Sequence, residues 1–226
     1  MESMYNLVKD FFSNDMDLND LYDSEAIIWI DWREYDEDVV RYFNDMMAEP
    51  IDIEIVSNGK PYGDDIVLKN GNKELQIPYG DEQDRDVTIK YFNGFVKPDY
   101  EVRWFTESLG NDTLGFTVLS GAEWAKLNDE FGADVVRYYF EPIGFESDMF
   151  NLGMDEVFAL LALRENSEGV NTQFSTQLDW IRIINKEKTL AEQKENGQID
   201  LKRYMVAKKE LQQSKDDFIA AHGPMK

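Results

Sequence analysis

Carboxylates are the reactive side chains that this sequence supplies in quantity. The chain holds 46 Asp and Glu residues, no Cys, and a single His, His222, close to the C-terminus. Thiol catalysis and zinc–thiolate sites therefore need a residue type that is missing, and a Ser–His triad needs a better-placed base. The pattern of a Gly-rich phosphate-binding loop does not occur either. The sequence favours a binding protein over an enzyme, and we expect it to need no cofactor.

Nine acidic residues in three segments form the candidate partner-binding site. They are Asp36, Glu37, Asp38, Asp64, Asp65, Asp81, Glu82, Asp84 and Asp86. Such a block can face the Lys and Arg side chains of a basic protein, with Tyr35, Tyr79 or Tyr91 as aromatic anchors where they are exposed. The alternative is a solvated surface that serves solubility or begins a helix, because carboxylates stabilise the positive end of a helix by about 0.3 to 1 kcal/mol each.

The acidic clusters are poor candidates for a metal site. One stretch places Asp15, Asp17 and Asn19 where a calcium loop has its first three ligands. Its sixth position is Asp20, where the tight turn needs Gly, and its twelfth is Ala26, where a bidentate Glu is required. No pair of carboxylates stands out for glycoside hydrolysis. We therefore predict neither metal ligands nor catalytic residues.

The negative charge belongs to the first two thirds of the chain. The formal charge is -23, and residues 1–155 hold 35 acidic and 12 basic residues, whereas residues 156–226 hold 11 of each. We predict an acidic domain at 1–155 and a charge-neutral helical extension at 156–226. So acidic a domain repels nucleic-acid phosphates and anionic membranes, since both need a basic patch. The expected partner is a basic protein.

The expected location is the cytoplasm. The N-terminus lacks the pattern of a secretory signal, and no run approaches eighteen consecutive apolar residues. The lack of Cys fits a reducing compartment.

The spacing of apolar residues predicts short helices and strands joined by hairpins in the acidic domain. Strands are expected at 26–32, 51–55, 100–107, 112–119 and 134–140, and helices at 4–12, at 36–49 and after Ser120, where Ser120 and Glu123 have capping-box spacing. Residues 84–96 fit a strand or a helix, and the aspartates before them favour the helix. The Asn70-Gly71 pair predicts a hairpin that sets Ile66 opposite Leu75. The fold class is α+β, a mainly antiparallel sheet built from hairpins with helices packed on one face.

The last third of the chain is expected to be helical. Residues 154–164, 178–195 and 199–221 have helical composition or spacing, with a break at Asn196-Gly197. The last helix has only a rough apolar stripe, so this piece is expected to pack against another surface. The hairpin at 177–221 either joins copies of the chain into a homo-oligomer or covers one edge of the sheet, and both interpretations stay open.

Several strings in the acidic domain carry a family resemblance. They are IDWREYDEDVVRYF (30–43), IPYGDEQDRDVTI (77–89), KPDYEVRW (97–104), SLGNDTLGF (108–116) and FEPI (140–143), which follows the helix with Trp124. Over about residues 25–150 they resemble cytoplasmic immunity-type proteins of Gram-positive bacteria, which neutralise polymorphic or secreted toxins. The resemblance implies an inhibitor of a toxin and transfers no contact residues. ENGQIDLKRYMVAKKEL (195–211) is similar to a short bacterial C-terminal module that mediates association.

Two other functions fit the same composition. A DNA mimic from a phage or mobile element would carry two rows of carboxylates at phosphate spacing and would block a nucleic-acid-binding defence protein. A scaffold or accessory protein would oligomerise through its neutral tail and would use the acidic domain only for solubility. The immunity hypothesis instead predicts a neighbouring gene for a toxin with a basic C-terminal domain.

Overall fold

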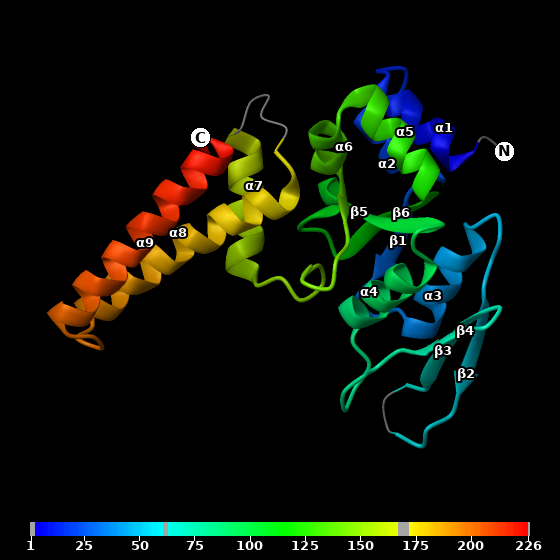
Figure 1. The fold of residues 1–226 in the computed structure, drawn as a ribbon, viewed down its shortest axis with the longest axis horizontal. Coiled ribbons are helices and arrows are strands. Elements are labelled where there is room, and N and C mark those ends of the chain that lie inside the picture. Colours follow the sequence, from blue (N-terminus) through cyan, green and yellow to red (C-terminus); the bar gives the residue numbers. More distant parts are fainter. Residues whose placement is uncertain (1–2, 61–62, 167–171, 226) are drawn as a thin grey trace. The chain divides into compact units, whose positions relative to one another are not determined.

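The computed structural model describes residues 3–60, 63–166 and 172–225. The chain divides into two units, Met1–Leu152 and Gly153–Lys226 (Figure 1). The first unit contains two antiparallel sheets and several helices, and the second is helical. These features confirm the predicted α+β class with C-terminal helices. None of the helices in the described ranges has both the length and the apolar character that crossing a membrane requires.

Helices and strands are interspersed along the first unit. Its helices are α1 (Met4–Phe12), α2 (Leu18–Tyr22), α3 (Asp36–Asp45), α4 (Arg85–Val96), α5 (Gly121–Phe131) and α6 (Ala133–Tyr139), with a 3₁₀ turn at Thr106–Ser108. Its strands are β1 (Ile28–Asp31), β2 (Asp52–Val56), β3 (Asp65–Asn70), β4 (Lys73–Gln76), β5 (Tyr100–Phe105), β6 (Thr113–Ser120) and β7 (Phe140–Pro142). They form a four-stranded sheet in the order β1-β6-β5-β7 and a three-stranded sheet in the order β2-β3-β4.

Helices pack on both faces of the four-stranded sheet, whereas we expected them on one face (Figure 1). Phe105 and Leu119 lie in a core with residues of α1 and with Trp124 of α5. Phe116 points to the other face, where its ring centroid lies 5.7 Å from that of Phe43 in α3. Because successive strand residues point to opposite faces, a strand covered on both sides is buried along most of its length. This explains why β6 is buried at every position except its two ends, Thr113 and Ser120.

The helix predicted for residues 84–96 is confirmed as α4. The Asp84 side chain caps it by accepting a hydrogen bond from the Val87 backbone N–H at 3.1 Å. Helix α3 begins at Asp36 as predicted but ends at Asp45 rather than at Glu49. The Asn44 side chain accepts a hydrogen bond from the Ile51 N–H at 2.8 Å and donates one to the Ile51 carbonyl, which turns the chain toward β2.

The hairpin at β3 and β4 forms, but its register differs from the predicted one. Leu75 lies opposite Leu68 instead of Ile66, so the loop begins at Gly71. Gly71 has a φ of 58°, and a two-residue loop with Gly in its first position suits a type II′ turn. A shift of two residues keeps each side chain on its face of the sheet, and Ile66 and Leu68 are both fully buried as expected.

The strand predicted at 134–140 is wrong, because most of this segment is helix α6. Only Phe140–Pro142 joins the sheet, as the edge strand β7. The β-branched Val135 and Val136 favour a strand locally. In the fold, Val136 is fully buried in the core shared with α5 and Phe140. Tertiary packing of one helical face therefore decides the conformation.

The capping box of α5 is confirmed. Ser120 Oγ accepts a hydrogen bond from the Glu123 N–H at 3.2 Å, and Glu123 Oε2 accepts one from the Ser120 N–H at 2.9 Å.

We expect Ser120→Ala to lower the free energy of unfolding by about 1 kcal/mol, because the cap loses its side-chain acceptor. Urea unfolding measures the change. Ser57→Ala, at an exposed loop serine, is the control and should change stability by less than about 0.5 kcal/mol; equal losses in the two variants would contradict the role of the cap.

The second unit consists of α7 (Met154–Asn166), α8 (Phe174–Glu195) and α9 (Leu201–His222). Helices α8 and α9 form a hairpin with a turn at Asn196-Gly197, where Gly197 has a φ of 68°. The rings of Trp180 and Phe218 pack between the two helices, with centroids 5.2 Å apart. Arg182 donates a hydrogen bond to Glu156 at 2.9 Å and so ties α8 to α7.

Candidate functional site

A buried ion pair joins the starts of α3 and α4. The Arg85 Nε donates to Asp36 Oδ1 at 3.0 Å, and the same guanidinium donates to the backbone carbonyls of Asp31 and Glu34. Arg85 thus holds both ends of the short loop between β1 and α3. That loop carries Trp32 and Tyr35, which are 58% and 68% exposed. A mostly buried cation therefore positions two exposed aromatic rings.

The Asp36 side chain is only 3% exposed. Burial raises the pKa of its carboxyl above the ordinary value, because removal from water disfavours the charged form. The hydrogen bond and positive charge of Arg85 act in the opposite direction. Arg85 is thus the main group that favours the charged form of this buried carboxyl.

Asp86 is a second buried carboxylate, and it is 1% exposed. Its two oxygens accept hydrogen bonds from three consecutive backbone N–H groups, those of Met149 at 2.9 Å, Phe150 at 2.9 Å and Asn151 at 3.2 Å. Burial raises the pKa of Asp86, and the three backbone donors oppose that rise. Asp86 therefore fixes the last segment of the first unit against α4.

A hollow of about 290 Å³ lies between the loop that carries Trp32 and Tyr35, the residues around the start of α4, and residues 150–151. It is lined by Trp32, Glu34, Tyr35, Asp36, Gln83, Asp84, Arg85, Phe150 and Asn151. Asp84 accepts hydrogen bonds from the Asn151 side chain at 3.2 Å, and Phe150 lies under the Arg85 guanidinium, 5.5 Å from the ring centroid. Hydrogen bonds and a cation–π contact thus hold the wall of the hollow together, while its rim is aromatic and acidic.

A second, smaller depression adjoins the first through Gln83, which lines both. It is bordered by Asn58, Lys60, Asp64, Asp65, Tyr79, Gly80, Asp81, Glu82 and Gln83. The fold therefore gathers carboxylates from three distant segments. We call this surface the acidic face and define it as Glu34, Asp64, Asp65, Asp81, Glu82 and Asp84 together with the rings of Trp32 and Tyr35.

The nine predicted contact residues divide by exposure. Asp81 and Glu82 are exposed, and Asp64, Asp65 and Asp84 are half-buried on the acidic face. Asp36 and Asp86 are buried, so their predicted role as surface contacts is corrected: both carboxylates hold the fold together beneath that face.

The two remaining contact candidates lie in the first turn of α3. Glu37 is half-buried, and so is Asp38, which forms an ion pair with Arg41 at 3.1 Å. Their position matches the alternative that the sequence left open, in which carboxylates stabilise the start of a helix. These two residues therefore stay outside the acidic face.

The sequence predicted only part of the aromatic rim of the hollow. Trp32 was expected inside a strand at 26–32, but β1 covers only Ile28–Asp31 and forms the edge of its sheet, so Trp32 projects from the loop. Tyr35 is exposed as the anchor hypothesis requires. Tyr79 and Tyr91 are half-buried: the Tyr79 hydroxyl hydrogen bonds to Thr88 at 2.7 Å, and the Tyr91 ring contacts Phe145.

The weak calcium-loop pattern has a structural explanation. Asp17 caps α2 by accepting hydrogen bonds from the N–H groups of Asn19 at 2.8 Å and Asp20 at 2.9 Å. Within the described ranges, no group of three or more acidic or His side chains is arranged to hold a metal ion.

Comparison with protein-family models gives no match for this chain. The search of curated proteins likewise finds no match. No solved structure matches it either.

Proposed function

We propose that the chain is a binding protein that captures a basic protein on its acidic face, and that this capture neutralises a toxin, as the resemblance to immunity proteins implies. The observation that supports the proposal is the convergence of segments 31–36, 64–65 and 81–86 on one face with two exposed aromatic rings. These three segments lie apart in the sequence, so it is the fold that brings their side chains together.

The acidic face has the chemistry that a Lys- or Arg-rich surface requires. Exposed carboxylates at Asp81 and Glu82 speed the encounter with a cationic partner and disfavour anionic ones. Exposed aromatic rings supply the contact area that dominates most protein interfaces. The guanidinium of the neighbouring Arg33 lies over one face of the Trp32 ring, 4.6 Å from its centroid, so a cation of the partner would use the other face or displace Arg33.

The fixed backbone beneath the acidic face also supports the proposal. The Arg85 and Asp86 contacts fix the backbone beneath the face, so little conformational freedom is lost when a partner docks. A protein with this role against an intracellular toxin would act in the cytoplasm, which is the location we propose.

Capture from a lysate of the native host tests this proposal. We expect the wild-type chain to enrich one basic protein, and Asp81→Lys/Glu82→Lys to lose it. The control is Asp112→Lys/Asp129→Lys, which makes the same charge change at exposed positions outside the acidic face. A DNA-binding protein that DNA competes away would favour the mimic hypothesis instead. Equal loss in both variants would contradict a specific face.

The association rate of the captured partner provides a second prediction. We expect it to fall by about tenfold or more between low and physiological salt, because a Debye length near 8 Å at about 0.15 M screens charge steering. Stopped-flow mixing measures the rate. A rate that does not depend on salt would argue against electrostatic capture.

A further inference from the structure

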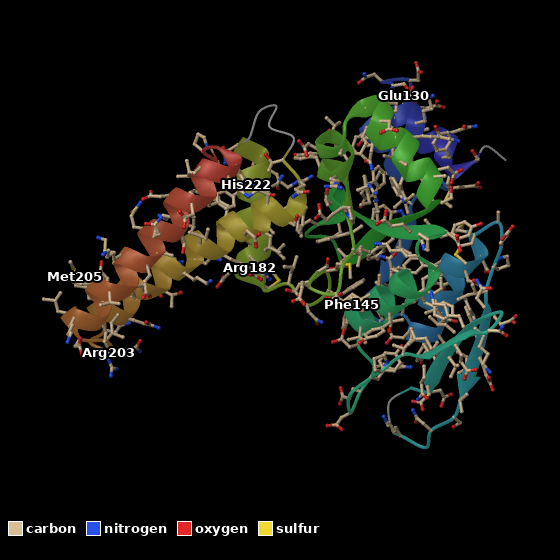
Figure 2. All side chains as sticks on the ribbon, in the orientation of Figure 1. Glu130, Phe145, Arg182, Arg203, Met205 and His222 are labelled. Carbon is tan, nitrogen blue, oxygen red and sulfur yellow. The ribbon has the colours of Figure 1, made fainter. Side chains whose placement is uncertain are left out.

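The first turns of α9 carry a surface that differs in charge from the rest of the protein. Between positions 201 and 209 there are four basic residues and no acidic one. The outward positions of this stretch are all exposed: Leu201, Lys202, Arg203, Met205, Val206, Lys208 and Lys209. Figure 2 shows Arg203 and Met205 projecting at the turn of the hairpin. We call these seven residues the basic tip.

Helical geometry interleaves the two kinds of side chain on the basic tip. Leu201, Met205 and Lys208 recur at spacings of four and three residues and share one stripe, and Lys202, Val206 and Lys209 share the next. The inner side of the helix is different: Tyr204 is half-buried and lies beneath the ammonium groups of Lys194 and Lys208, which are 4.5 and 5.9 Å from its ring centroid. The outward stripes therefore lie away from the hairpin's own packing.

The first turn of α9 is basic, although its N-cap is acidic. Asp200 caps the helix by accepting a hydrogen bond from the Arg203 N–H at 2.8 Å, while the first turn itself holds Lys202 and Arg203 and no acidic residue. The Arg203 side chain is 81% exposed, and its contact with Asp200 is long, at 3.9 Å. Leu201 and Met205 are 67% and 58% exposed. Exposed basic side chains beside exposed apolar groups point to a surface that binds.

We infer that the basic tip docks on the acidic face of a second copy of this chain. Charge complementarity identifies the occupant, because residues 1–155 hold 35 acidic residues against 12 basic ones and the tip is locally basic. The apolar parts also correspond: Leu201, Met205 and Val206 can cover the exposed rings of the acidic face. The inference rests on the proposed function, since the tip occupies the face assigned there to a basic partner.

Such a contact is heterologous, so each copy keeps one unused tip or face and can bind a further copy. Two copies each carry a formal charge of -23 and repel one another at very low salt. At about 0.15 M salt the Debye length is near 8 Å, so only charges close to the interface count and the tip–face contact prevails. Self-association is therefore expected to be strongest near this salt concentration and weaker both at very low salt and above about 0.5 M.

Sedimentation velocity of the full chain at about 0.15 M salt tests the inference. We expect concentration-dependent association of the wild type, weakened by about tenfold or more in the tip variant Lys202→Glu/Arg203→Glu and in the face variant Asp81→Lys/Glu82→Lys. The control Lys186→Glu/Lys188→Glu reverses two exposed charges elsewhere on the hairpin and should associate like the wild type.

Mixing the two variants gives the decisive result. The tip variant keeps an intact face and the face variant keeps an intact tip, so the mixture should form a one-to-one heterodimer at concentrations where each variant alone stays monomeric. A monomeric wild type at every concentration would overturn the inference. So would undiminished association of the face variant alone, which would mean that tips bind tips.

The inference and the proposed function fail in different ways. The tip variant should still capture the basic partner, because its acidic face is unchanged. If no basic partner is captured but the mixed variants form the heterodimer, the acidic face serves assembly alone. If the partner is captured and the mixture stays monomeric, only the tip inference is lost.

Discussion

Replacing Asp86 with Ala is expected to lower the free energy of unfolding by about 3 kcal/mol. The Asp86 carboxylate accepts hydrogen bonds from the backbone N–H groups of Met149, Phe150 and Asn151. Ala leaves all three donors without this acceptor, and a buried unpaired donor costs about 1 to 3 kcal/mol. The Met149 N–H is the most costly because its residue is almost fully buried, whereas Asn151 is exposed and its N–H can turn to water.

Two further variants separate this role from a general effect of charge. Asp86→Asn keeps one oxygen acceptor, so we expect about half the loss seen with Ala. Asp81→Ala removes an exposed carboxylate from the loop that precedes α4, and it should change stability by less than about 0.5 kcal/mol. Urea unfolding of the full chain measures all three variants. Losses of similar size in Asp86→Ala and Asp81→Ala would contradict the role of the three backbone hydrogen bonds.

Local sequence signals predicted those parts of the fold that depend on a few neighbouring residues. The capping box at Ser120 and Glu123 forms as expected, and so does the helix that Asp84 caps. The hydrogen bonds of each cap span one helical turn, so their energy depends little on the remainder of the chain. The hairpin at Gly71 was predicted to exist, but its register depends on the turn type, which the Asn-Gly pair alone left open.

Long-range packing determined what the sequence did not predict. Residues 134–140 have the β-branched composition of a strand, yet the burial of Val136 against α5 makes most of them a helix. Trp32 is exposed because β1 ends at Asp31 and Trp32 lies in the loop that follows, and the residue at which a strand ends is not encoded in the spacing of one segment. Propensity is a weak guide at such positions because tertiary contacts outweigh it.

The candidate site was likewise predicted only in part. The sequence identified the acidic segments that converge on the acidic face, but it assigned Asp36 and Asp86 to the surface. Their partners are Arg85, which lies 49 positions after Asp36, and the backbone of residues 149–151, which begins 63 positions after Asp86. No local spacing connects these groups. Carboxylates that hold a site together therefore look the same in the sequence as carboxylates that contact a partner.

Replacing Arg85 with Met is expected to lower the free energy of unfolding by about 3 to 5 kcal/mol, because it leaves the buried Asp36 carboxylate without its cation. It also removes the donors to the Asp31 and Glu34 carbonyls, so the loop that carries Trp32 and Tyr35 loosens. We therefore expect weaker capture of the basic partner, although Arg85 is mostly buried. Urea unfolding measures the stability, and a change of less than about 1 kcal/mol would contradict this role.

The double variant Asp36→Asn/Arg85→Met separates the ion pair from the packing of the Arg85 side chain. It buries no unpaired charge, so we expect it to regain about 2 kcal/mol relative to Arg85→Met alone. A double variant no more stable than Arg85→Met would mean that the loss comes from packing and from the two carbonyls, not from the stranded carboxylate.

The pH dependence of these variants provides an independent check. Burial already raises the pKa of Asp36, and loss of Arg85 removes groups that lower it. A carboxyl whose pKa is raised in the folded state favours folding most when it is protonated, and that contribution is lost as the pH rises through the interval between its unfolded and folded pKa values. The destabilisation by Arg85→Met should therefore be smaller at about pH 5 than at about pH 7. The asparagine introduced by Asp36→Asn does not titrate, so this difference should vanish in the double variant. A pH dependence that persisted there would have to come from another group, and Asp36 would then not be the carboxylate that Arg85 keeps ionised.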